Sequence, residues 1–173
     1  VYDRSVPAAS AIGLYDYAMN RLCGELGVKV LTIAGNHDSA ERLASCAGLL
    51  DKAGLYLQGA AQREPRAVAF ADSQVFFLPW MTEEKIKSLY PEERDGINGL
   101  TEAYRVAVNH MREKFIPGKR HLLLSHAFIT NAETSTSDRA AEIGFATQVP
   151  ASVFEGCDYV AVGHIHKPQQ VNS

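Results

Sequence analysis

The sequence predicts an α/β domain in which strands and helices are arranged in layers. Three short apolar runs, at 28–34, 121–124 and 159–162, have the length of strands buried in a sheet. Apolar residues recur at three- and four-residue spacing over 5–26 and 101–115, as expected of amphipathic helices. With 173 residues, 46% of them hydrophobic, the chain is long enough to bury one core.

The N-terminal part predicts a helix, a strand and a second helix. Ser5 is the expected N-cap of the first helix, Pro7 lies in its first turn, and Gly27 ends it before the strand over 28–34. We expect the second helix over 40–53, ending at Gly54, followed by a short strand over 55–57.

The middle of the chain predicts a hairpin and two further helices. Two apolar runs within 66–79 flank the turn-forming pair at 72–73, which favours a β-hairpin. Helices are expected over 82–89 and over 101–115. Residues 130–142 are rich in Thr, Ser, Asn and Glu and have no periodicity, so we expect a solvated loop.

Composition narrows the class of protein. No apolar run approaches the roughly 18 residues of a membrane span. The net charge of −3 argues against a generally basic nucleic-acid-binding surface. It does not exclude a nuclease, because divalent cations can supply positive charge at a phosphate. Cys23, Cys46 and Cys157 are widely spaced, so we expect reduced core thiols in a cytoplasmic protein.

Histidine and asparagine side chains follow each of the three apolar strands. Residues 35–38 (Gly-Asn-His-Asp) follow the first, His126 the second, and residues 163–166 (Gly-His-Ile-His) the third. Such strand ends can assemble one site from distant residues, and imidazole with amide oxygen suits Mn, Fe or Zn. We expect Asp38 to fix its loop without binding metal, and His110 and His121 to be structural.

These motifs resemble those of the calcineurin-like metallophosphoesterases. The five motifs of that family are D-x-H, G-D-x-x-D, G-N-H-[DE], a lone His and G-H-x-H. Residues 35–38 match the third, His126 the fourth and residues 163–166 the fifth, while residues 1–4 resemble the end of the second. The resemblance implies a layered α/β/β/α sandwich, incomplete at both ends. Residues 1–173 would be a partial nuclease domain lacking the D-x-H and G-D segments and a C-terminal capping region.

Longer stretches are similar to one branch of this family, the bacterial DNA-end nucleases. This branch implies a 3′→5′ exonuclease on duplex ends and an endonuclease on single strands and hairpins, acting in DNA repair, recombination and replication. It also implies a coiled-coil ATPase partner and a homodimer of nuclease subunits. The expected cofactors are two divalent metal ions, with Mn²⁺ as the first choice. The similar stretches are 2–7, 27–43, 77–80, 135–139 and 149–161.

The resemblance also assigns roles to single residues. His37 would face the scissile phosphate and protonate the leaving oxygen or stabilise charge, with Asp3 orienting its imidazole. Arg4 would contact the phosphate through its guanidinium group. One metal ion would be held by Asn36, His126 and His164, and the other by His166.

Two other interpretations remain open at this point. The metal motifs are equally compatible with a phosphomonoesterase or a cyclic-nucleotide phosphodiesterase of the same family. Alternatively, the chain is a non-catalytic scaffold. Since only His166 remains for the second ion, we expect the chain alone to bind metal weakly and to have little or no nuclease activity.

Overall fold

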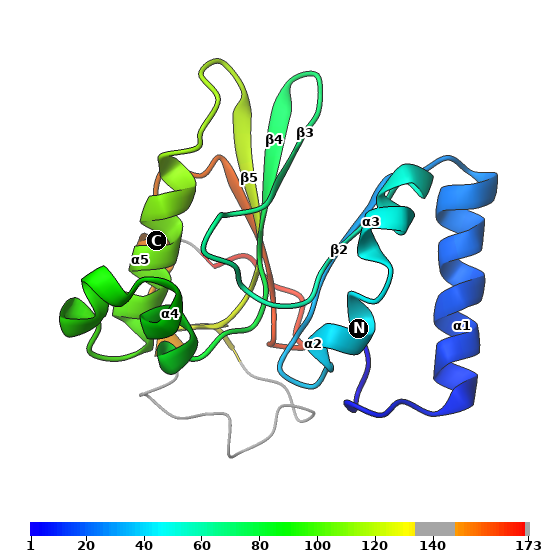
Figure 1. Ribbon diagram of the computed structural model, residues 1–173, viewed down its shortest axis with the longest axis horizontal. Helices are drawn as coiled ribbons and strands as arrows, with labels where there is room; N and C mark the ends of the chain where they lie inside the picture. Colours follow the sequence, from blue (N-terminus) through cyan, green and yellow to red (C-terminus); the bar gives the residue numbers. More distant parts are fainter. Residues whose placement is uncertain (134–147, 172–173) are drawn as a thin grey trace.

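The computed structural model describes residues 1–133 and 148–171, and its strands form three sheets within this part of the chain. In Figure 1, helices α4 and α5 lie on one side of the largest sheet, with β2 and helices α1, α2 and α3 on the other. The α/β class is therefore confirmed. The four-stranded sheet has the order β3 (Ala67–Ala69), β4 (Ser73–Leu78), β5 (Arg120–His126) and β8 (Tyr159–Gly163). The two-stranded sheets pair β1 (Val30–Ile33) with β2 (Leu55–Gln58), and β6 (Phe128–Ile129) with β7 (Gln148–Val149).

The first helix begins later than predicted. Helix α1 (Ala9–Met19) has Ala8 as its N-cap and continues as a π-helix over Asn20–Glu25. Ser5 is therefore not the cap, because the chain bends over residues 3–6 and the extended residue directly before the helix is Ala8. Gly27 ends the helix as predicted, with a left-handed φ of 66°.

The predicted helix over 40–53 is divided into three short pieces: α2 (Ala40–Leu43), α3 (Ala47–Leu50) and a 3₁₀ turn over Asp51–Ala53. The break comes at Cys46, whose φ of 59° is left-handed and cannot continue a right-handed helix. Gly54, with a φ of 86°, ends the last piece as predicted.

The remaining helices and the hairpin follow the predictions closely. Strands β3 and β4 pair antiparallel. Helix α4 (Glu83–Leu89) is capped by Thr82, whose side-chain oxygen accepts from the Lys85 N–H at 3.2 Å. Helix α5 (Leu100–Arg112) ends before the predicted boundary at 115. Short 3₁₀ helices cover Pro91–Gly96 and Ala151–Phe154, and the predicted loop lies outside the described residues from residue 134 onward.

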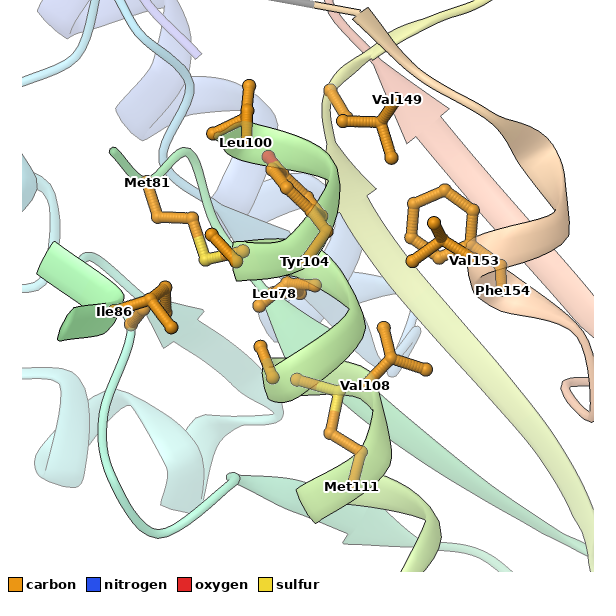
Figure 2. Packing of buried hydrophobic residues seen from close by; sticks show 14 of the residues in the cluster. Leu78, Met81, Ile86, Leu100, Tyr104, Val108, Met111, Val149, Val153 and Phe154 are labelled. Atoms are coloured by element: carbon orange, nitrogen blue, oxygen red, sulfur yellow. The ribbon is translucent and has the colours of Figure 1, made fainter. Parts of the chain in front are cut away.

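The main core lies between α5 and the four-stranded sheet. Tyr104 and Val108 on α5 are fully buried and face Leu78 of β4, while Phe154 closes the cluster (Figure 2). Burying each such side chain stabilises the fold by about 1.5–3 kcal/mol. This packing anchors β4 and β5, the strands that lead to Trp80 and His126.

The expectation that the strands over 28–34 and 159–162 are buried was wrong. Strand β1 is only half-buried, and β8 exposes Tyr159 and Val162 because it lies at the edge of its sheet. All three cysteines are unpaired, as predicted, but Cys46 is exposed and so is not a core thiol. In the described part of the chain, none of the helices combines the length and apolar character that crossing a membrane requires.

Candidate metal centre

Parallel pairing brings two of the predicted motifs to one edge of the four-stranded sheet. Strands β5 and β8 run parallel with His126 opposite Gly163, and the Ala127 N–H donates to the Gly163 carbonyl at 3.2 Å. Residues 35–38 come from the two-stranded sheet of β1 and β2, where β1 ends directly before the buried Ala34. Ala34 is tied to the end of β4, because its carbonyl accepts from the Trp80 N–H at 3.0 Å.

Three of the four predicted metal ligands lie together at this edge. His126 Nε2 lies 2.9 Å from Asn36 Oδ1 and 3.3 Å from His164 Nδ1. Two ligand atoms held about 2.1 Å from one ion lie roughly 3.0–3.4 Å apart, for right-angled or tetrahedral geometry. The three side chains therefore fit the coordination of a single ion.

The ring of His126 is suited to be a neutral ligand. Burial, and next the neighbouring His164, lower the pKa of His126 to about 4. The imidazole is therefore neutral at pH 7, the form in which a histidine binds metal. From the other side, the buried Tyr104 hydroxyl donates to the backbone carbonyl of His126 at 2.7 Å and so holds the strand end.

Residues 35–38 and residues 163–166 form two tetrads, and the single glycine of each makes room for the His126 ring. A Cβ on Gly35 would lie 2.6 Å from His126 Cε1, far inside ordinary contact distance. A Cβ on Gly163 would lie 3.1 Å from His126 Nδ1. The close approach of the His126 ring therefore explains on steric grounds why Gly35 and Gly163 have no side chain.

His166 is placed differently from the other three predicted ligands. It is exposed and lines an open cavity of about 690 Å³ together with Ile165 and Lys167. Among residues 1–133 and 148–171, no three or more histidine, cysteine, aspartate or glutamate side chains are grouped to hold a metal ion. His126, His164 and His166 thus form no three-histidine cluster, and the role predicted for His166 stays a prediction.

Asp38 fixes the loop that carries Asn36 and His37, as expected. Its carboxylate accepts from the backbone N–H groups of Gly35 and Tyr2, both at 2.8 Å. Hydrogen bonds from backbone N–H groups favour the charged form of a carboxylate. The tetrad is therefore held by a charged residue that needs no metal.

His37 contacts Asp3 through the backbone. His37 Nδ1 lies 2.9 Å from the Asp3 carbonyl oxygen, which can only accept, so Nδ1 carries the proton in this contact. The Asp3 and Arg4 side chains are 80% and 81% exposed, and they lie 3.6 Å apart. The structure thus adds a carbonyl contact that sequence reasoning missed, and the predicted roles of both side chains stay predictions.

Two aromatic residues near the centre had no role in the sequence analysis. The Trp80 indole is stacked on the His164 ring, and Tyr104 holds the His126 carbonyl. Trp80 could have been noticed, because the apolar run 74–79 ends directly before it. By contrast, His110 stacks on Tyr90 and His121 on Phe115, in the structural environments predicted for them.

Comparison with known proteins tests the resemblance directly. No family model matches the chain. Over all 173 residues it is 28% identical to an SbcCD nuclease subunit of Staphylococcus epidermidis (strain ATCC 12228 / FDA PCI 1200). The resemblance to the nuclease subunit of SbcCD is therefore confirmed. The chain spans about half of that relative, 46% of its length.

Proposed function

We propose that this chain is part of the catalytic domain of a metal-dependent DNA nuclease subunit acting in DNA repair. The main observation behind the proposal is that Asn36 Oδ1 and His164 Nδ1 both lie within 3.3 Å of His126 Nε2. The whole-chain similarity to a protein named a nuclease supports it. We propose Mn²⁺ as the metal, in a pair of ions of which the second uses His166. Bound there, divalent cations would neutralise the phosphate and polarise its P–O bonds.

We assign to His37 the proton transfer to the leaving oxygen. The Nδ1–H contact with the Asp3 carbonyl fixes the orientation of the ring. In its imidazolium form, His37 would keep this contact and give the Nε2 proton to the leaving oxygen, returning to the neutral ring. A positioned imidazole of this kind contributes about 10²–10⁴-fold in rate. Arg4, exposed beside Asp3, would contact the phosphate of the substrate.

The test of this assignment compares two histidine variants in the whole protein. His37→Ala should abolish turnover of a DNA hairpin while the Mn²⁺ content stays near that of the wild type. His126→Ala should lose both activity and metal, because it removes a ligand. Loss of metal from His37→Ala would instead make His37 a ligand and would contradict its role in proton transfer.

The substrate class is tested with a panel of phosphate esters. We propose 3′→5′ exonuclease action on duplex ends and endonuclease action on single strands and hairpins. The panel contains duplex DNA with free ends, a DNA hairpin, bis(p-nitrophenyl) phosphate and p-nitrophenyl phosphate. Activity on the monoester alone would favour a phosphomonoesterase, and absence of bound Mn, Fe or Zn from the purified protein would favour a scaffold.

The proposed partners are DNA, a coiled-coil ATPase subunit and a second nuclease subunit. The relative is named as one subunit of a complex, which supports the ATPase. The second nuclease subunit is tested by light scattering of the whole protein, where the mass of a monomer would contradict a homodimer. Cytoplasmic location stays a prediction.

A further inference from the structure

Trp80 contacts two of the candidate metal ligands although it follows a strand that supplies none. Its ring is stacked on His164, with centroids 5.7 Å apart and planes 10° apart. It also meets His126 edge to face, with centroids 6.0 Å apart and planes at 89°. Both arrangements are favourable for aromatic rings, each contributing on the order of 0.5–1.5 kcal/mol.

The backbone at His164 explains why such a contact is needed. His164 has a φ of 122°, a conformation that a residue with a side chain rarely adopts. Strained residues of this kind persist only where the surrounding contacts hold them. The His164 ring has Trp80 stacked against it, Phe128 tilted at 5.7 Å and His126 at 5.2 Å.

The position of Trp80 is itself fixed by the fold. The backbone N–H of Trp80 donates to the carbonyl of Ala34 at 3.0 Å, and Ala34 is the residue directly before the tetrad that contains Asn36. Pro79 before it is fully buried, at the end of the core strand β4. Trp80 thus connects the end of β4 to the end of β1 and places its ring over side chains from β5 and β8.

We propose that Trp80 is a positioning residue that holds the His164 and His126 imidazoles in the orientation required to bind one divalent ion. This inference rests on the proposed metal-dependent function. In this role Trp80 acts through the two imidazoles, because it limits the rotation of their rings before the ion arrives. Without the stacked ring, part of the binding energy would be used to order His164.

The test measures Mn²⁺ affinity by titration calorimetry in three variants of the whole protein. Trp80→Leu keeps an apolar side chain but removes the ring, and it should weaken binding about three- to tenfold. Trp80→Phe keeps a ring that can stack and should stay within about twofold of wild type. Phe70→Leu is the matched control, because it removes a ring from the edge-to-face pair with Tyr56 and should leave affinity unchanged.

Two further measurements separate positioning from mere packing. Urea unfolding in EDTA gives the metal-free stability of each variant. If Trp80→Leu loses stability but its folded protein binds Mn²⁺ like the wild type, the inference is wrong. Trp80 is also the only tryptophan of this chain, so the emission lost in Trp80→Phe is its own. The Trp80 emission should change on addition of Mn²⁺, and the midpoint of this change should equal the midpoint measured by calorimetry. An emission that does not change on addition of Mn²⁺ would overturn the inference.

The wild-type titration distinguishes this inference from the proposed function. A wild-type protein that binds no divalent ion overturns both. A wild-type protein that binds Mn²⁺, with Trp80→Leu binding equally well, overturns only the role of Trp80.

Discussion

Replacing Gly35 with alanine tests whether the close approach of the tetrad backbone to His126 builds the metal centre. The added methyl group would lie 2.6 Å from His126 Cε1, 3.0 Å from Nδ1 and 3.1 Å from Nε2. Non-bonded carbon atoms prefer a separation of about 3.5–4.0 Å, so the ring or the tetrad must move by about 1 Å.

A displacement of this size is large compared with the geometry of the site. His126 Nε2 and Asn36 Oδ1 are 2.9 Å apart, and a further 1 Å would separate them by about 3.9 Å, beyond the limit of roughly 3.2 Å for a good hydrogen bond. The ring has little room to adjust, because Trp80 and His164 pack on it. We expect a loss of about 1–3 kcal/mol in unfolding free energy and of about 10–100-fold in Mn²⁺ affinity.

The assay is urea unfolding in EDTA together with Mn²⁺ titration of the folded protein. Gly48→Ala is the matched control, because its new Cβ meets no atom within 4 Å. That variant should bind Mn²⁺ like the wild type and should be equally or slightly more stable. If Gly35→Ala also keeps wild-type affinity and stability, the ring tolerates the methyl group and the steric explanation of this glycine is refuted.

Three further predictions concern stability. The pKa of His126 is lowered to about 4 in the folded protein, so between pH 6.5 and 4 the unfolded chain protonates this imidazole and the folded protein does not. The free energy of unfolding should therefore be highest above pH 6.5 and should decrease as pH falls toward 4. The loss is about 3 kcal/mol in metal-free urea unfolding, and His126→Phe should remove this part of the pH dependence; a pH-independent wild type would contradict it. Gly59→Ala should cost about 1–3 kcal/mol relative to Gly48→Ala, because its Cβ would lie 2.0 Å from the Ala40 carbonyl oxygen; equal melting temperatures would argue against this contact. Tyr104→Phe should lower the free energy of unfolding in urea by about 1–3 kcal/mol, because it leaves the His126 carbonyl without its donor; an unchanged free energy would contradict this role of the hydroxyl.

Local patterns were a good guide where neighbouring residues decide the conformation. The hairpin formed because apolar strands flank a turn pair, and α4 began at Thr82 because its side chain can cap a helix. The same reasoning failed at Ser5 and within 40–53. The chain bends over residues 3–6, before the helix begins, and the backbone turns left-handed at Cys46. No spacing of apolar residues indicates either feature.

The candidate site divides in the same way. Residue types and their places after strands predicted that Asn36, His126 and His164 lie close together, because strand ends deliver side chains to a sheet edge, and the structure brings these three side chains into contact. Their binding of a metal ion stays a prediction. Their mutual distances, the low pKa of His126 and the stacking of Trp80 come from segments up to 128 positions apart in the chain (164 − 36). Such contacts depend on how two sheets pack together, and no local pattern contains that information. The tetrads therefore specify the chemistry of the site, whereas packing between distant strands determines which of their side chains can act together.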